Sequence, residues 1–221
     1  MGIRENLQEI TETIPQGVTL IAVSKTKPIE ALVEAYEAGQ RNFGENKIQE
    51  MVLKMEELPG DIHWHFIGNL QRNKVKYLDD RVYLVHSLDR ESLAIELNKN
   101  ALKKGYVQNV LLEINIGRED NKGGCLTEDL PSLINTIGQL SALHVRGLMA
   151  VIPDTSDKEK QAHYFKAMKE LFDQYQLVRG ERFEMKILSM GMSGDYQSAM
   201  ACGSTMVRIG SAIFGARDYS K

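Results

Sequence analysis

The chain has 221 residues, of which 43% are hydrophobic and 26% are charged, and its formal net charge is −3. These values are typical of a soluble globular protein, and the length fits one domain over residues 1–221. The slight negative charge gives no basic footprint for nucleic acid, and no run reaches the ~18 apolar residues of a membrane helix. Cys125 and Cys202 form neither a metal-ligand spacing nor a disulfide framework. We therefore expect a cytoplasmic protein with reduced thiols.

The predicted elements alternate between helix and strand along the chain. An amphipathic helix is expected at residues 3–14, where isoleucine and leucine recur at helical spacing, and residues 18–23 predict a buried strand. Further strands are predicted at 41–44, 63–67, 82–85, 109–116, 144–150, 185–188 and 206–209. Helical segments are predicted between them, at 28–38, 47–58, 70–77, 89–104, 127–138, 157–177 and 193–202.

About eight strands alternating with helices in repeats of roughly 25 residues indicate a parallel α/β fold. At this length, such repeats close into a single (β/α)8 TIM barrel, here with an extra helix at the N-terminus. The alternative is an open doubly wound sheet, whose first turn after a strand carries a glycine-rich nucleotide loop. The corresponding segment here, SKTKP, contains no glycine, which favours the barrel.

Two lysines follow the first strand directly, before Pro28 opens the next helix. Lys25 is expected to project from the C-terminal end of a central strand, where α/β folds place their chemistry. An amine held against apolar walls has a lowered pKa and can attack a carbonyl group. Lys27 has two interpretations, a solvated lysine at a helix start or a second amine that assists transfer.

The loops after the seventh and eighth strands contain the groups of a phosphate site. Ser193 follows a glycine-rich turn and is expected to cap the next helix, while Arg208, Gly210 and Ser211 end the last strand. Each loop alone could be an ordinary capped turn, but barrels commonly bind phosphate at these two positions. A phosphorylated aldehyde would satisfy these residues and Lys25 together, and pyridoxal 5′-phosphate is the cellular example. Met192, at a strand end, is placed to touch its ring.

The motifs AVSKTKP, RNFGEN, HFIGNLQRNK, GLMA, LSMGMSGD and VRIGSAIFG resemble, in order and spacing, the pyridoxal phosphate homeostasis protein family. The barrel of that family is similar to the N-terminal domain of alanine racemase. The resemblance implies that Lys25 holds the cofactor as a Schiff base, with Lys27 nearby as a second amine. It also implies the remaining contacts: Arg208 at the pyridine nitrogen, Ser193, Gly210 and Ser211 at the phosphate, and Asn46 and His65 along the face of the cofactor.

An arginine at the ring nitrogen keeps its proton, so the ring is a weak electron sink and carbanion chemistry is poorly supported. Racemases of this type add a tyrosine base from a second domain, and we expect no such domain after Lys221. The sequence therefore predicts an intracellular carrier or buffer of pyridoxal phosphate that influences vitamin B6, amino-acid and keto-acid pools. We expect a monomer that meets apo-enzymes transiently and binds neither nucleic acid nor membrane.

Two other functions remain open from the sequence. One is a minimal racemase-like or decarboxylase-like enzyme that uses the same cofactor. The other is a Schiff-base aldolase that uses Lys25 without a cofactor. A metal site is not expected: His63 and His65 share one face of a strand, but no third ligand lies in local spacing, which favours a packed or hydrogen-bonded pair.

Overall fold

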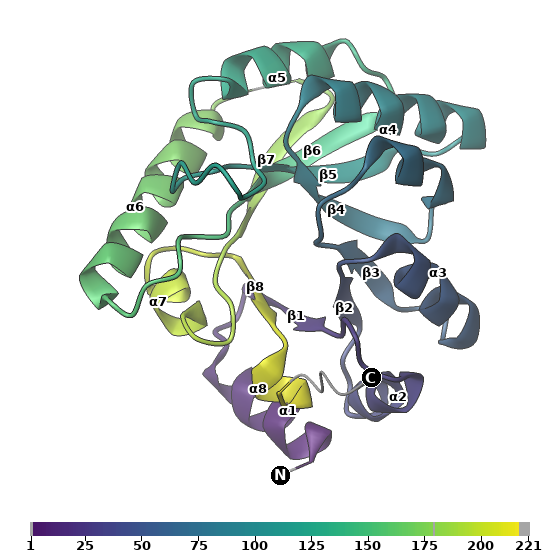
Figure 1. The fold of residues 1–221 in the computed structure, drawn as a ribbon, viewed down its shortest axis with the longest axis vertical. Helices are drawn as coiled ribbons and strands as arrows, with labels where there is room; N and C mark the ends of the chain where they lie inside the picture. The colour runs from purple at the N-terminus through teal and green to yellow at the C-terminus, as the bar shows by residue number, and fades with distance from the viewer. Residues whose placement is uncertain (1, 179, 217–221) are drawn as a thin grey trace.

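The predicted alternation of strands and helices is confirmed in a computed structural model that describes residues 2–178 and 180–216. Eight parallel strands pair in sequence order, and the last pairs with the first to close a barrel surrounded by helices (Figure 1). The strands are β1 (Thr19–Val23), β2 (Asn42–Glu45), β3 (His63–Phe66), β4 (Val82–Leu88), β5 (Gln108–Glu113), β6 (Leu143–Met149), β7 (Phe183–Ser189) and β8 (Met206–Ile209).

The helices lie outside the strands, as the (β/α)8 arrangement requires. They are α1 (Ile3–Thr13), α2 (Ile29–Glu37), α3 (Ile48–Glu57), the 3-10 helix η1 (Arg72–Tyr77), α4 (Glu91–Lys104), α5 (Leu130–Gly138), α6 (Lys158–Tyr175), α7 (Tyr196–Ala201) and α8 (Ser211–Phe214). The extra N-terminal helix is α1, which buries Leu7 and Ile10 and packs against α2 and α8.

Several predicted boundaries differ from the structure, among them those of β2, the segment after β3 and β4. β2 continues through Gly44 to Glu45, because this glycine pairs with β1 and β3 and does not turn the chain. The segment after β3, predicted to be helical over 70–77, is a short 3-10 helix that begins at Arg72. β4 continues three residues past its predicted end because His86 and Ser87 are buried strand residues. The helix α8 was not predicted.

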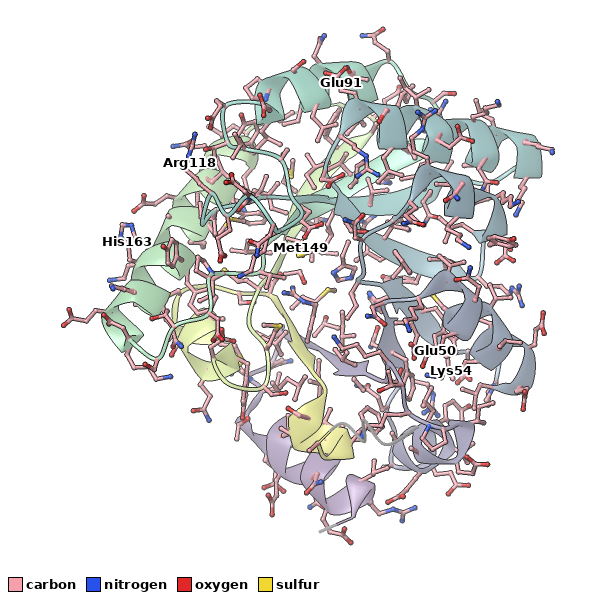
Figure 2. The ribbon with its side chains drawn as sticks, in the orientation of Figure 1. Glu50, Lys54, Glu91, Arg118, Met149 and His163 are labelled. Atoms are coloured by element: carbon pink, nitrogen blue, oxygen red, sulfur yellow. The ribbon has the colours of Figure 1, made fainter. Side chains whose placement is uncertain are left out.

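Two apolar layers stabilise the fold. The larger one fills the space between the strands and the helices, and a smaller cluster lies inside the barrel. The inner cluster consists of Ile21, Leu84, Leu111, Met149 and Met206. Figure 2 shows Met149 within the ring of strands. Val151 and Ile187 pack against this cluster, while His65, His86 and Arg208 are buried polar residues of the interior. These polar residues are unusual, because branched apolar side chains dominate most barrels of this type.

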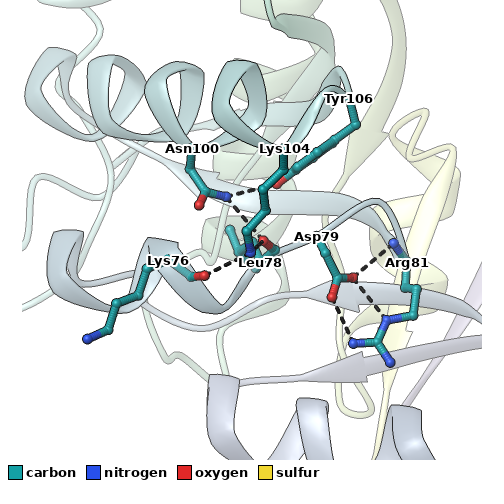
Figure 3. Close-up of polar contacts among 7 residues, drawn as sticks. All are labelled: Lys76, Leu78, Asp79, Arg81, Asn100, Lys104 and Tyr106. Carbon is teal, nitrogen blue, oxygen red and sulfur yellow. Dashed lines mark hydrogen bonds and ion pairs between the residues drawn. The ribbon is translucent and has the colours of Figure 1, made fainter.

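The connection between η1 and β4 is fixed by the last turns of α4 (Figure 3). Lys104 Nζ donates hydrogen bonds to the carbonyl oxygens of Lys76 and Leu78, at 2.9 and 2.6 Å. Asn100 Nδ2 also donates to the Leu78 carbonyl, at 3.1 Å. Gly105 ends α4 in the left-handed conformation with φ of 75°, which glycine adopts readily at the end of a helix.

Within the described residues, no helix is both long and apolar enough to cross a membrane, and no group of three potential ligands could hold a metal ion.

Candidate functional site

A cavity of about 470 Å³ opens at the C-terminal ends of β1 and β8. Its volume lies in the range of small-molecule sites. Seven of the nine predicted site residues line it: Lys25, Lys27, Met192, Ser193, Arg208, Gly210 and Ser211. Val23, Ile67, Val151, Gly194 and Gly215 complete the lining. A larger cavity of about 890 Å³ lies between α1, β1 and the end of α2, and none of the predicted site residues lines it.

The charge of this cavity suits an anion. Lys25, Lys27 and Arg208 contribute three cationic groups, and no aspartate or glutamate is among the described lining residues. Met192 is 42% exposed and Ser211 is also exposed, so these residues form the mouth of the cavity. The site therefore combines a positive wall with an opening to solvent.

A buried ion cluster holds the segment that carries Lys25. Ser24 Oγ donates to Glu45 Oε1 at 2.6 Å, and Lys54 Nζ donates to the Ser24 carbonyl oxygen at 2.9 Å. Glu50 Oε1 accepts the backbone N–H of Thr26 at 2.6 Å. Thr26 has a φ of 64°, a conformation that costs a non-glycine residue about 1–3 kcal/mol. The cluster thus fixes the chain on both sides of Lys25.

Lys54 links the two carboxylates of this cluster. Its Nζ lies 2.7 Å from Glu45 Oε1 and 2.7 Å from Glu50 Oε1. Figure 2 labels Glu50 and Lys54 side by side on α3. Burial raises the pKa of Glu45, while Lys54 and the hydroxyl of Ser24 oppose the rise.

The two loops of the predicted phosphate site contact each other. The backbone N–H of Gly210 donates to Ser193 Oγ at 3.2 Å. Gly210 packs so closely on β1 that a Cβ there would lie 3.1 Å from the Val23 carbonyl oxygen. The expectation that Ser193 caps α7 was wrong: Asp195 is the residue before the helix, and its carboxylate accepts the N–H of Met192 at 2.6 Å.

Lys27 is half-buried and does not simply extend into solvent. Its Nζ donates to the carbonyl oxygens of Phe214, Gly215 and Ala216, at 2.8, 3.2 and 3.1 Å. Because Gly215 also lines the cavity, Lys27 anchors one part of the cavity wall.

Arg208 is buried at the base of the cavity. Its Nη1 donates to Ser189 Oγ at 2.6 Å and its Nη2 donates to the Ala150 carbonyl oxygen at 3.0 Å. None of the ion pairs among the described residues includes this arginine. Burial lowers its pKa to about 10, with partial compensation from Glu113 and Asp195, so the group stays cationic at neutral pH.

His65 and Asn46 are not among the residues that line the cavity, and their predicted contact with the cofactor stays a prediction. This histidine lies fully buried inside the barrel, with its Nδ1 3.0 Å from His86 Nε2 and its Nε2 3.1 Å from Asn42 Oδ1. Burial lowers its pKa to about 3. Asn46 is half-buried, and its Oδ1 is buried without a hydrogen-bond partner among the described residues.

The paired-histidine interpretation was partly right, but the partner is different. His65 pairs with His86, whereas His63 stacks on Tyr83 with ring centroids 4.5 Å apart. His86 and Ser189 were missed as members of the site region. The sequence signal that could have found them is that each is a polar residue at an inward-facing position of an otherwise apolar strand.

Comparison with known proteins identifies the family. The model of the alanine racemase N-terminal domain matches residues 2–218. A pyridoxal phosphate homeostasis protein of Aquifex aeolicus is 42% identical over 221 residues, which cover 98% of this chain and 96% of the relative. The protein of that name from Escherichia coli is 41% identical over 211 residues, covering 94% and 89%. The chain belongs to the pyridoxal phosphate homeostasis proteins.

Solved structures agree with this assignment. PipY of Synechococcus elongatus, solved without PLP, superposes with a TM-score of 0.91 at 35% identity, covering 96% of this chain and all of PipY. The structure of PipY with PLP bound gives a TM-score of 0.88 at 34% identity, with the same coverage. An alanine racemase of Clostridium difficile shares the fold alone, at 16% identity and a TM-score of 0.77, and this chain covers 60% of it.

Proposed function

We propose that this protein binds pyridoxal 5′-phosphate in the cavity at β1 and β8 and acts as a carrier or buffer of the cofactor. The observation that carries the proposal is the convergence of Lys25, Arg208 and Ser193 on one cavity with a cationic lining. The names of the relatives and the PLP-bound structure of PipY support the same ligand.

The donor groups of the cavity fit this ligand. Lys25 supplies the amine that bonds to the aldehyde carbon, while Ser193, Ser211 and the backbone of Gly210 supply donors for the phosphate. Arg208 uses two nitrogens on Ser189 and Ala150, so its other N–H groups are available to the ring nitrogen. Met192, which lines the cavity, would lie against the ring. Asn46 does not line the cavity, and its Oδ1, which has no hydrogen-bond partner among the described residues, would be an acceptor if the cofactor reaches it.

The chemistry of Arg208 favours holding the cofactor over turnover. Pyridoxal phosphate supplies an electron-withdrawing ring to its enzymes, and this effect is strongest when the ring nitrogen is protonated. A guanidinium group donates a hydrogen bond to that nitrogen but keeps its proton. The exposed mouth of the cavity gives an apo-enzyme or a small amine access to the bound cofactor.

The test is a titration of the purified protein with pyridoxal phosphate, followed by absorbance. We expect a visible band in the wild type and in Lys103→Ala, whose lysine is exposed and remote, and no band in Lys25→Ala. Borohydride reduction and peptide mass spectrometry should then locate the cofactor on Lys25. A band that survives in Lys25→Ala, or a wild type that takes up no cofactor, would refute the proposal.

The carrier role itself is tested with the loaded protein. We expect it to activate an apo-enzyme that depends on pyridoxal phosphate, and to run as a monomer in size-exclusion chromatography. Robust racemase or decarboxylase turnover of amino acids that disappears in Lys25→Ala would replace the carrier role by the enzyme alternative.

A further inference from the structure

Five polar side chains run through the barrel interior in one continuous series. Arg208 Nη1 lies 2.6 Å from Ser189 Oγ, which lies 3.3 Å from His86 Nδ1. His86 Nε2 lies 3.0 Å from His65 Nδ1, and His65 Nε2 lies 3.1 Å from Asn42 Oδ1. The series, here called the interior chain, begins at the cavity and ends at the opposite mouth of the barrel, where β2 begins.

The hydrogen bonds of the interior chain have one direction that gives an acceptor to the Ser189 hydroxyl and to the ring N–H of both histidines. Arg208 can only donate, so Ser189 Oγ accepts from it, and the hydroxyl proton of Ser189 goes to His86 Nδ1. His86 then carries its proton on Nε2 and donates to His65 Nδ1, and His65 Nε2 donates to Asn42 Oδ1. In the reverse direction the buried hydroxyl of Ser189 has no acceptor among its contacts, a loss of about 1–3 kcal/mol.

The surroundings support two neutral imidazoles in this series. His65 and His86 are both fully buried, and burial lowers the pKa of each. The positive charge of Arg208 acts in the same direction on His86. A neutral imidazole has one donor and one acceptor, which is what each position in the series requires. The low dielectric of the barrel interior strengthens such connected hydrogen bonds.

We propose that Ser189, His86, His65 and Asn42 are positioning residues that hold the guanidinium of Arg208 for the ring nitrogen of pyridoxal phosphate. The inference rests on the proposed function. Arg208 is anchored at two nitrogens, by Ser189 and by the carbonyl of Ala150, so its plane cannot rotate while both contacts persist. The interior chain keeps the Ser189 oxygen lone pairs turned toward Arg208, because the hydroxyl proton is committed to His86.

The first test examines the chain itself in the unliganded protein. Nuclear magnetic resonance of the imidazole nitrogens, with signals assigned by His65→Gln and His86→Gln, reports which nitrogen carries the proton. We expect the Nε2–H tautomer on both histidines. An Nδ1–H tautomer on His65 or His86, or a doubly protonated ring at neutral pH, would overturn the inference. Neither result would contradict the proposal that the protein binds the cofactor.

The second test compares Ser189→Ala with Ser204→Ala. Ser204 is a matched control because, in the part of the chain that the structure describes, its buried hydroxyl bonds only to the backbone carbonyls of Leu188, Met190 and Met206. Each variant is titrated with pyridoxal phosphate and with an analogue in which C–H replaces the ring nitrogen. The measured quantity is the affinity for the natural cofactor divided by the affinity for the analogue. We expect this ratio to be the same in the wild type and Ser204→Ala, and about 10-fold smaller in Ser189→Ala.

The analogue separates positioning from a general structural role. If Ser189→Ala weakens both ligands equally, or leaves both unchanged, the interior chain does not act through the ring nitrogen and the inference is wrong. A wild type that binds neither ligand refutes the proposed function first, and with it the role assigned to the chain. Thermal unfolding of each variant confirms that the compared proteins are folded.

Discussion

Replacing Lys54 by methionine should destabilise the protein strongly, although methionine preserves most of the side-chain volume. The Lys54 side chain is 5% exposed and lies between Glu45 and Glu50, with the Glu45 side chain 0% exposed. Removing the ammonium group leaves the Glu45 carboxylate buried, with Ser24 Oγ as its one remaining donor among the described residues. Its second oxygen, Oε2, already has no partner among the described residues.

Breaking a buried ion pair by deleting one partner costs about 3–5 kcal/mol, because an uncompensated buried charge remains. With a urea slope of about 3 kcal/mol/M, the unfolding midpoint should fall by about 1 M or more. The loss should also depend on pH. Burial raises the pKa of Glu45, and Lys54 opposes that rise, so the substitution raises the pKa further. The folded state then holds a proton that the unfolded state releases, and stability falls as pH rises from about 4.5.

The assay is urea unfolding of the wild type, Lys54→Met, Lys54→Met/Glu45→Gln and the exposed control Lys103→Met, at pH 5 and pH 8. The double variant should recover most of the lost stability, since replacing both members of a buried pair is often neutral. Equal losses in the single and double variants would show that lysine packing, and not charge, is responsible. A change below about 1 kcal/mol in Lys54→Met would refute the reasoning altogether.

Three further predictions use groups around the same barrel. Burial raises the pKa of Glu113 to about 7, so the free energy of unfolding should fall by up to about 3 kcal/mol as pH rises from 4.5 to 7. In urea titrations, Glu113→Gln should remove this dependence on pH. The Lys27→Ala variant should keep the colour of the cofactor bound to Lys25. It should release the cofactor faster in stopped-flow trapping, because the substitution removes the hydrogen bonds that anchor Phe214 and Gly215 in the cavity wall. Slower release would favour a transfer role for Lys27. Burial also raises the pKa of Cys125 to about 12, so a thiol reagent should modify the half-buried Cys202 first, as checked by mass spectrometry.

The arrangement of the cavity could be predicted because it follows from topology. In a closed parallel barrel the first and last strands are neighbours, so Lys25 after β1 and Arg208 on β8 face one mouth without any knowledge of side-chain contacts. The turn with Ser193 follows β7, which is the other neighbour of β8. Strand order alone therefore brings these groups together. An apolar run that ends in a lysine is enough to predict that Lys25 lies at this mouth of the barrel.

The interior of the barrel could not be predicted in the same way. A histidine within an apolar run is ambiguous, because it can end a strand or point inward, and the strand predicted at 82–85 stopped before His86. His65 was predicted to contact the cofactor from the family resemblance, which does not reveal that it lies inside the barrel, 3.0 Å from His86. The role of Lys27 depended on the short helix α8, which carries no sequence signal long enough to predict.

The polar interior is difficult to explain by stability alone. A guanidinium group without an ion pair is unfavourable in the barrel centre, as the lowered pKa of Arg208 indicates, and an apolar side chain of similar volume would fill the same space at lower cost. The hydrogen bonds to Ser189 and Ala150 satisfy only part of its donor set. The remaining donors need an acceptor that the described residues do not supply, and under the proposed function a ligand in the cavity would provide one. Fold and function therefore make opposing demands at this position, which is where a binding site is expected.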